Sequence, residues 1–140
     1  MVELYYYKLL ALFKKEKRPY VLAGGNKGIK NLVEDFYEIM DKDSKVDQIR
    51  QMHPKDLTLS KEKLTKFLSG WFGGPNLYWQ AYGHPRMRAR HMKFTIDASA
   101  RDQWLACMKM AIQNTKWNQE FKDYTYKSMS DFAHHMQNRK

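Results

Sequence analysis

Apolar residues recur along this chain at the spacing of an α-helix. The longest series steps by three and four positions and comprises Ile29, Leu32, Val33, Phe36, Tyr37 and Met40. A second series comprises Leu64, Phe67, Leu68 and Trp71 and stops at a Gly73-Gly74-Pro75 break. Such spacing predicts amphipathic helices with one buried face, and a glycine pair followed by proline typically ends a helix. Since no segment alternates polar and apolar residues convincingly, the sequence predicts an all-α fold.

Shorter patterns predict the remaining N-terminal elements. Residues 4–13 have helical apolar spacing ahead of a basic run, and residues 46–52 contain a short helical turn. Asn26 and Ser60 are predicted to cap the two long helices, because short polar side chains bond the free N–H groups of a first turn. Residues 76–91 are predicted to be mostly loop, with a short helix that contains His91.

The C-terminal half is predicted to contain two further helices. The first begins at Asp97, and its inward face consists of Trp104, Met108, Ala111 and Ile112. A last helix, kinked or frayed, follows Lys116. A length of 140 residues is typical of one domain with a sizeable core. We expect a single domain over residues 1–140, with an extension at 1–19, a core at about 20–115 and a C-terminal helix or tail at 116–140.

Composition excludes several classes of protein. With 43% apolar and 14% aromatic residues, the chain is not expected to be disordered. One cysteine, Cys107, excludes an internal disulfide and a cysteine-based zinc site, and its setting predicts a buried, inert thiol. No apolar run approaches the ~20 residues of a membrane span. The first residues are apolar and then basic, the reverse of a signal peptide, so a cytoplasmic protein without membrane association is expected.

The formal charge of +10 raises the alternative of a cofactor-free basic helical module that binds nucleic acid or an acidic partner. The lysines are scattered, apart from clusters at residues 14–18 and 86–90, and no known nucleic-acid motif accompanies them. A solvated basic surface that affects solubility and encounter rates is the favoured interpretation.

One histidine has a distinctive chemical setting. His91 follows Arg86, Arg88 and Arg90 and precedes the apolar Phe94. A nitrogen ligand beside hydrocarbon and guanidinium groups suits haem, because the iron takes an imidazole, the porphyrin face packs on apolar groups and the propionates pair with cations.

The other four histidines are weaker candidates for an iron ligand. His134 and His135 are adjacent and are expected on the surface. His84 precedes Pro85, which disfavours helix there, so a loop hydrogen bond is expected. His53 also precedes a proline and is either a pocket residue or a loop histidine.

The order of several motifs resembles the truncated haemoglobins of group II, over roughly residues 20–112. The matching segments are Ala23-Gly24-Gly25, Phe36-Tyr37, the residues from Phe67 to Pro75, the run from Gly83 to His91, and the run from Arg101 to Met108. The resemblance implies a two-over-two helical sandwich around a b-type haem.

The resemblance also implies roles for individual residues. His91 corresponds to the proximal iron ligand, and Arg90 and Lys63 correspond to propionate partners. The other residues expected to contact haem are Leu64, Phe67, Leu68, Tyr78 and Trp104. The residues expected around the bound ligand are Tyr37, Trp104, His53, Ser60, Leu64 and Phe36.

The function implied is reversible binding of dioxygen and other diatomic ligands, with redox chemistry on nitric oxide or peroxide as an extension that requires a reductase. Tyr37 and Trp104 would otherwise be ordinary core aromatics. Each carries one polar hydrogen, however, and a buried O–H or N–H needs an acceptor. Whether turnover occurs in the cell, and whether the protein is a monomer or a homodimer, does not follow from these residues.

Overall fold

The structure is a computed structural model that describes residues 18–140. The helix expected over residues 4–13 lies outside the described residues. The elements, in chain order, are α2 (Pro19–Leu22), α3 (Gly25–Lys42), the 3₁₀ helix η1 (Ser44–Val46), α4 (Asp47–Gln51), α5 (Thr58–Trp71), α6 (Leu77–Tyr82), α7 (Met87–His91), α8 (Ala98–Gln113) and α9 (Gln119–Met136). Residues 18–140 contain no strand, so the expected all-α class is confirmed.

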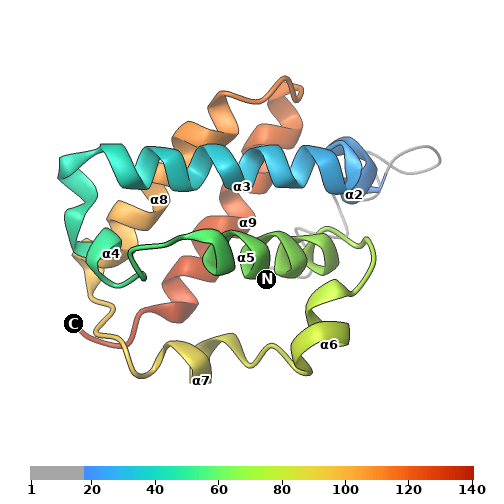
Figure 1. Cartoon of the computed structure of the whole chain (residues 1–140). Helices are drawn as coiled ribbons and strands as arrows, with labels where there is room; N and C mark the ends of the chain where they lie inside the picture. The colour runs from blue at the N-terminus through green and yellow to red at the C-terminus, as the bar shows by residue number, and fades with distance from the viewer. Residues whose placement is uncertain (1–17) are drawn as a thin grey trace.

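Four long helices form two pairs (Figure 1). α3 and α5 run in opposite directions and pack on each other, and α8 packs on both α9 and α3. The short helices α6 and α7 lie along one edge of this sandwich, between the end of α5 and the start of α8. The arrangement is the expected two-over-two sandwich. No helix in the described part of the chain has the length and apolar character needed to cross a membrane.

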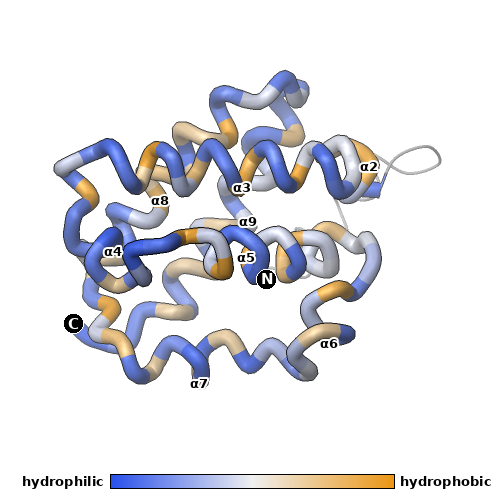
Figure 2. The backbone as a smooth tube through the Cα atoms, in the orientation of Figure 1, coloured by the Kyte–Doolittle hydropathy of each residue, from blue (hydrophilic) through white to orange (hydrophobic). Residues whose placement is uncertain are grey.

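The apolar series in α3 supplies much of the core. All six of its members are buried: Ile29, Leu32, Val33, Phe36, Tyr37 and Met40. Apart from Ile39 and glycine, polar residues occupy the intervening positions, and Figure 2 shows the resulting alternation along the helix. Complete burial of a large apolar side chain contributes about 1.5–3 kcal/mol. α3 is therefore held in place by its own buried face.

The expected helix caps at Asn26 and Ser60 are wrong. α3 already begins at Gly25, with Gly24 as N-cap at φ 91°, a left-handed conformation that favours glycine. Asn26 therefore lies within the first turn. α5 begins at Thr58, where the carboxylate of Asp56 accepts from the Thr58 backbone N–H at 2.9 Å and from its hydroxyl at 2.7 Å. α5 therefore begins two residues before Ser60, and the Asp56 carboxylate bonds its first residue.

The break after α5 is confirmed, but the segment behind it is more regular than expected. Gly73 has φ 86°, and a Cβ at Gly74 would lie only 2.2 Å from the Tyr20 ring. Both glycines are therefore required where the chain turns. The next residues form α6, which the sequence analysis treated as loop. Burial of Tyr78 stabilises this six-residue helix, so tertiary packing decides its structure.

The C-terminal helices begin where side chains cap them. Asp97 accepts from the Ala100 N–H at 2.8 Å, as expected, and Asn118 accepts from the Phe121 N–H at 2.8 Å. α9 then runs without interruption from Gln119 to Met136. Cys107 is buried in α8, and burial raises the pKa of its thiol to about 11. The thiol is therefore protonated and inert at neutral pH.

Candidate functional site

The backbone fixes the tautomer of His91, which is the last residue of α7 and is half-buried. Its Nδ1–H donates to the Met87 carbonyl oxygen at 2.6 Å. A carbonyl only accepts, so Nδ1 must carry the proton, and in the neutral imidazole the lone pair then lies on Nε2. An imidazole oriented through one nitrogen is the usual arrangement for a metal-ligating histidine. His91 therefore offers Nε2 as a ligand.

A cluster of three aromatic side chains links α3 to α8. The Phe36 ring contacts the edge of Tyr37 at 4.9 Å and of Trp104 at 5.3 Å between centroids. Among the described residues, neither the Tyr37 hydroxyl nor the Trp104 indole N–H has a hydrogen-bond partner, yet neither atom is fully enclosed by protein. These two donors therefore border open space and remain available for an acceptor.

Burial controls the protonation of Tyr37. Desolvation raises the pKa of its hydroxyl well above the ordinary value near 10, because the phenolate would lose its water shell. The side chain is 5% exposed. Tyr37 is therefore a neutral O–H donor throughout the physiological pH range.

His53 lies beside Tyr37, with 5.6 Å between ring centroids. Its Nδ1–H donates to the Ile49 carbonyl oxygen at 2.7 Å. Desolvation lowers the pKa of the imidazole, the hydrogen bond to the Ile49 carbonyl partly opposes this, and the positive charge of Arg50 lowers the pKa further. His53 is thus neutral at pH 7, with the lone pair on Nε2. In this state Nε2 can accept a hydrogen bond but cannot donate one.

The segment that carries His53 is fixed by Arg50. The guanidinium donates to the carbonyl oxygens of Pro54 at 3.0 Å and Lys55 at 2.9 Å, and to Asp41 at 2.9 Å. This loop is therefore tied both to itself and to the end of α3.

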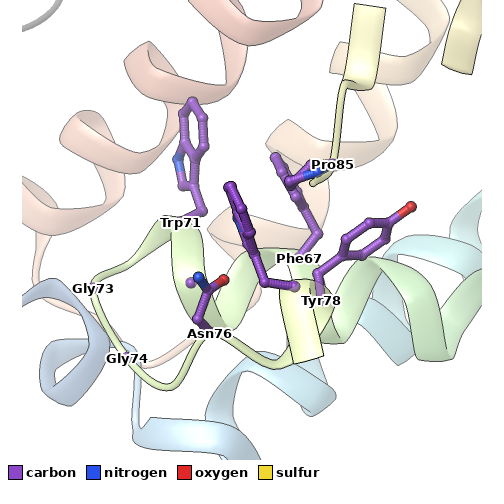
Figure 3. Close-up of a pocket in the computed structure, with 9 residues that line it drawn as sticks. Phe67, Trp71, Gly73, Gly74, Asn76, Tyr78 and Pro85 are labelled. Atoms are coloured by element: carbon purple, nitrogen blue, oxygen red, sulfur yellow. The ribbon is translucent and has the colours of Figure 1, made fainter. Parts of the chain in front are cut away.

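An aromatic wall extends from α5 to α6 and α9. The Phe67 ring lies 5.7 Å from Trp71, 6.1 Å from Tyr78 and 5.5 Å from Phe132 between centroids. Figure 3 shows Phe67, Trp71 and Tyr78 around a pocket of about 350 Å³ between α5 and α6. Such a wall offers aromatic faces and edges to a flat apolar ligand.

Comparison with known proteins identifies this arrangement. The sequence profile of the bacterial-like globins matches residues 19–138. The cold-adapted truncated haemoglobin of Pseudoalteromonas haloplanktis TAC125 is similar, with 38% identity, a TM-score of 0.86, and coverage of 89% of this chain and 100% of that one. The group II 2-on-2 haemoglobin of Agrobacterium tumefaciens shares 33% identity with a TM-score of 0.86, over 91% of this chain and 98% of that one.

A truncated haemoglobin from Bacillus subtilis that is described as oxygen-avid shares 35% identity with a TM-score of 0.78, over 87% of this chain and 100% of that chain. The chain belongs to the group II truncated haemoglobins. The matched residues include α9, which the resemblance in the sequence did not cover. α9 is part of the globin core, through Phe121, Tyr124 and Met129.

The residues of this truncated haemoglobin fit haem, the cofactor of globins. His91 offers a free Nε2, Phe67 and its neighbours form an aromatic wall, and unpartnered donors at Tyr37 and Trp104 border open space. The remaining histidines have other positions: His134 and His135 are exposed, and the His84 Nδ1 accepts from the Arg86 N–H at 3.0 Å, the loop hydrogen bond expected for His84.

The two expected propionate partners already have contacts with protein. Arg90 is exposed and donates through Nε to the Pro85 carbonyl oxygen and through Nη2 to those of His84 at 3.3 Å and Tyr82 at 3.4 Å. The Lys63 ammonium lies 5.4 Å from the centroid of the Tyr82 ring. Both cations therefore lie close to α6 and the α6–α7 turn, and Nη1 of Arg90 makes no hydrogen bond with the described residues.

The remaining expected site residues are Leu64, Leu68, Tyr78 and Ser60. Leu68 and Tyr78 are buried, and Leu64 is half-buried against the core. Ser60 is half-buried on α5 and, among the described residues, makes none of the ring contacts or hydrogen bonds of this site.

Phe132 and Asn138 were not predicted as site residues. Phe132 lies on α9, and its ring contacts those of Phe67, Trp71 and Trp104. Asn138 donates to the His91 carbonyl oxygen at 3.2 Å from beyond the end of α9, and no sequence pattern indicated this contact.

Proposed function

We propose that this truncated haemoglobin binds b-type haem through His91 and reversibly binds dioxygen and other diatomic ligands. When bound, haem supplies an iron whose open coordination position takes the diatomic ligand. The observation that carries the proposal is the fixed Nδ1–H of His91, which leaves Nε2 for the iron, together with free O–H and N–H donors in the aromatic cluster of α3 and α8.

The Tyr37 O–H and the Trp104 N–H would hold the ligand. Dioxygen gains negative charge on binding and becomes a good acceptor, so hydrogen bonds to it should slow its release. The B. subtilis relative, described as oxygen-avid, supports this expectation. His53 would act differently, because its neutral tautomer presents a lone pair on Nε2. It would accept from Tyr37 or from water rather than donate to the ligand.

The propionates would be held by Arg90 and Lys63. Three backbone carbonyls fix the Arg90 guanidinium through Nε and Nη2, which leaves the two N–H groups of Nη1 to pair with a carboxylate. Lys63 would contribute a mobile point charge. A guanidinium fixed in this way loses little further entropy when it binds a propionate.

An absorbance spectrum of the purified protein tests this function. We expect a Soret band, and reversible spectral changes when the ferrous protein is exposed to oxygen and then degassed. Absence of a Soret band after reconstitution with haem would favour the alternative of a cofactor-free basic module. Oxidation without a reversible oxygen-bound spectrum would contradict the proposed oxygen binding.

Redox turnover with nitric oxide or peroxide would need an electron donor, which we propose to be an acidic reductase. The stretch from Lys63 to Ile96 contains six lysines and arginines and no aspartate or glutamate. Of these six cations only Lys66 lies within 4 Å of a carboxylate in the described residues. The excess positive charge thus surrounds His91, where it would attract an acidic donor.

Electron transfer from an acidic ferredoxin, chemically reduced, tests this partner. We expect the rate to fall as ionic strength rises, and to fall in an Arg86→Gln, Lys93→Gln variant, because screening weakens attraction between opposite charges. Reduction by the cationic methyl viologen radical is the control, and it should not slow in either case. Equal behaviour of the two donors would contradict the proposal.

A further inference from the structure

The chain beyond α9 returns to the loop between α7 and α8. The backbone N–H groups of Asn138 and Arg139 donate to the Ile96 carbonyl oxygen at 2.9 and 3.1 Å. The Asn138 side chain uses both of its ends on the same loop. Its Oδ1 accepts from the Ile96 N–H at 2.9 Å, and its Nδ2 donates to the carbonyl oxygens of Phe94 at 3.0 Å and His91 at 3.2 Å.

A second set of contacts ties α7 itself to this segment. Nη1 of Arg88 donates to the carbonyl oxygens of His135 at 2.6 Å and Gln137 at 3.0 Å. Nη1 of Arg101, in the first turn of α8, donates to the Gln137 side chain at 2.7 Å. Residues 135–139 therefore bond the short helix that carries His91, the loop behind it and the start of α8.

α7 needs such support from outside. It has five residues and buries none of them. A helix of this length is not stable by itself, because the cost of nucleation exceeds the gain from so few hydrogen bonds. Most helices in proteins are instead held by a buried apolar face. Since α7 lacks one, its position depends on hydrogen bonds to other parts of the chain.

We propose that Asn138 is a positioning residue for the proximal histidine. By bonding the carbonyl oxygens of His91 and Phe94, it fixes the backbone at the end of α7 and with it the direction of the His91 ring. The inference rests on the proposed role of His91 as iron ligand. Asn138 itself acts only through the backbone of α7 and the following loop.

The side chain at position 138 must combine an acceptor with two donors. Asparagine does so in one planar amide. Aspartate has nearly the same shape and keeps the acceptor for the Ile96 N–H, but it has no N–H to offer. Its oxygen would instead face the carbonyl oxygens of His91 and Phe94, which is repulsive. Alanine would remove the acceptor and both donors.

Asn138→Asp therefore removes only the donors of this side chain, whereas Asn138→Ala removes the donors and the acceptor. In the haem-loaded protein we expect both variants to lose haem to an acceptor globin about three- to thirtyfold faster, the effect of losing one or two net hydrogen bonds. We also expect both to shift or broaden the iron–histidine stretching band in the resonance Raman spectrum of the ferrous protein. A change in fold stability alone would not move this band.

Hydrogen exchange of the Ile96 amide in the haem-free protein provides a readout independent of haem. Protection should persist in Asn138→Asp, whose carboxylate still accepts, and should fall in Asn138→Ala. Asn31→Asp is the matched control, because it makes the same change of charge at an exposed position on α3. It should leave haem loss, the Raman band and the exchange rate unchanged.

The outcomes distinguish the two proposals. If His91→Ala keeps haem with an unaltered spectrum, the assignment of His91 fails. If His91→Ala loses haem while both Asn138 variants retain the wild-type Raman band and rate of haem loss, the role of Asn138 fails and that of His91 stands.

Discussion

The helix that carries Tyr37 and the helix that carries His91 are held in place in opposite ways. α3 is 18 residues long and buries six of them in the core. α7 has five residues, buries none, and is tied by hydrogen bonds to a segment more than 40 residues further along the chain. The position of Tyr37 therefore depends on hydrophobic packing, whereas that of His91 depends on directional polar contacts.

This difference has a consequence for ligand binding. Packing of α3 fixes Tyr37, the proposed distal donor of that helix, within a dense core, where a shift would open a cavity. The end of α7 can move whenever a few hydrogen bonds break, without exposing core residues. We expect the distal side to set the rate of ligand release and the proximal side to set how firmly haem is held.

Alanine substitutions in the two helices should have contrasting effects. Phe36→Ala should lower the free energy of unfolding by about 3–5 kcal/mol, because a fully buried phenylalanine leaves a cavity. His91→Ala should abolish or severely weaken haem retention, while the haem-free protein should lose only about 0.5–1.5 kcal/mol of unfolding free energy, because one hydrogen bond of a half-buried side chain is removed.

Denaturant unfolding of the haem-free proteins and the Soret absorbance of the reconstituted ones measure these effects. His84→Ala is the control for the histidine, because the His84 ring bonds the Arg86 N–H and contacts the Trp79 ring, both outside the proposed iron-ligand position. If His84→Ala loses haem and His91→Ala does not, the assignment of the proximal ligand is wrong. A Phe36→Ala protein of wild-type stability would remove the claim that packing holds α3.

The two helices also differ in how well the sequence predicts them. The apolar series of α3 predicts the helix and its buried face, because burial of these regularly spaced residues stabilises the helix. The cap at Asn26 was wrong, since the left-handed conformation of Gly24 starts α3 earlier than a polar cap would. Local patterns therefore locate a long helix better than they locate its ends.

For α6 and α7 the local pattern carries less information. Burial of Tyr78 stabilises α6, and this contact depends on the fold as a whole. The arginines and apolar residues around His91 and the family resemblance both indicated this histidine and a short helix containing it, and the structure adds its bond to Met87. Asn138 lies in a polar stretch with no periodicity, so its contact with the His91 carbonyl could not be inferred from sequence. This hydrogen bond joins residues 47 positions apart in the chain, so only the three-dimensional structure reveals it.

The distal donors provide the next largest expected effect. Tyr37→Phe and Trp104→Phe should each accelerate oxygen release by about one to two orders of magnitude, because a lost hydrogen bond costs ~1.5–3 kcal/mol when its acceptor carries charge and most of the loss falls on the off-rate. The release of carbon monoxide, a poorer acceptor, should change less. The two effects need not add, since both donors share one ligand.

Stopped-flow measurement of oxygen dissociation tests these variants. Tyr126→Phe is the matched control, because Tyr126 lies on α9 with its ring against Lys109. Loss of the Tyr126 hydroxyl should leave the rate of oxygen dissociation unchanged. Wild-type rates in both Tyr37→Phe and Trp104→Phe would assign these residues to packing alone.

The smallest effect is expected at the two cations, and it sharpens the comparison on the proximal side. Exposed ion pairs contribute about 0.2–1 kcal/mol, so Lys63→Ala should speed haem transfer to an acceptor globin by about 1.5- to 5-fold. Arg90→Ala should exceed this, because it also removes the hydrogen bonds to the α6–α7 turn. Arg90→Lys keeps the charge but loses the planar fork, and its rate of haem transfer should fall between those of wild type and Arg90→Ala.

Lys93→Ala is the control at a nearby exposed cation. If the Arg90, Lys63 double alanine variant releases haem at the wild-type rate, neither cation holds a propionate, and hydrogen bonds around α7 alone retain haem on that side.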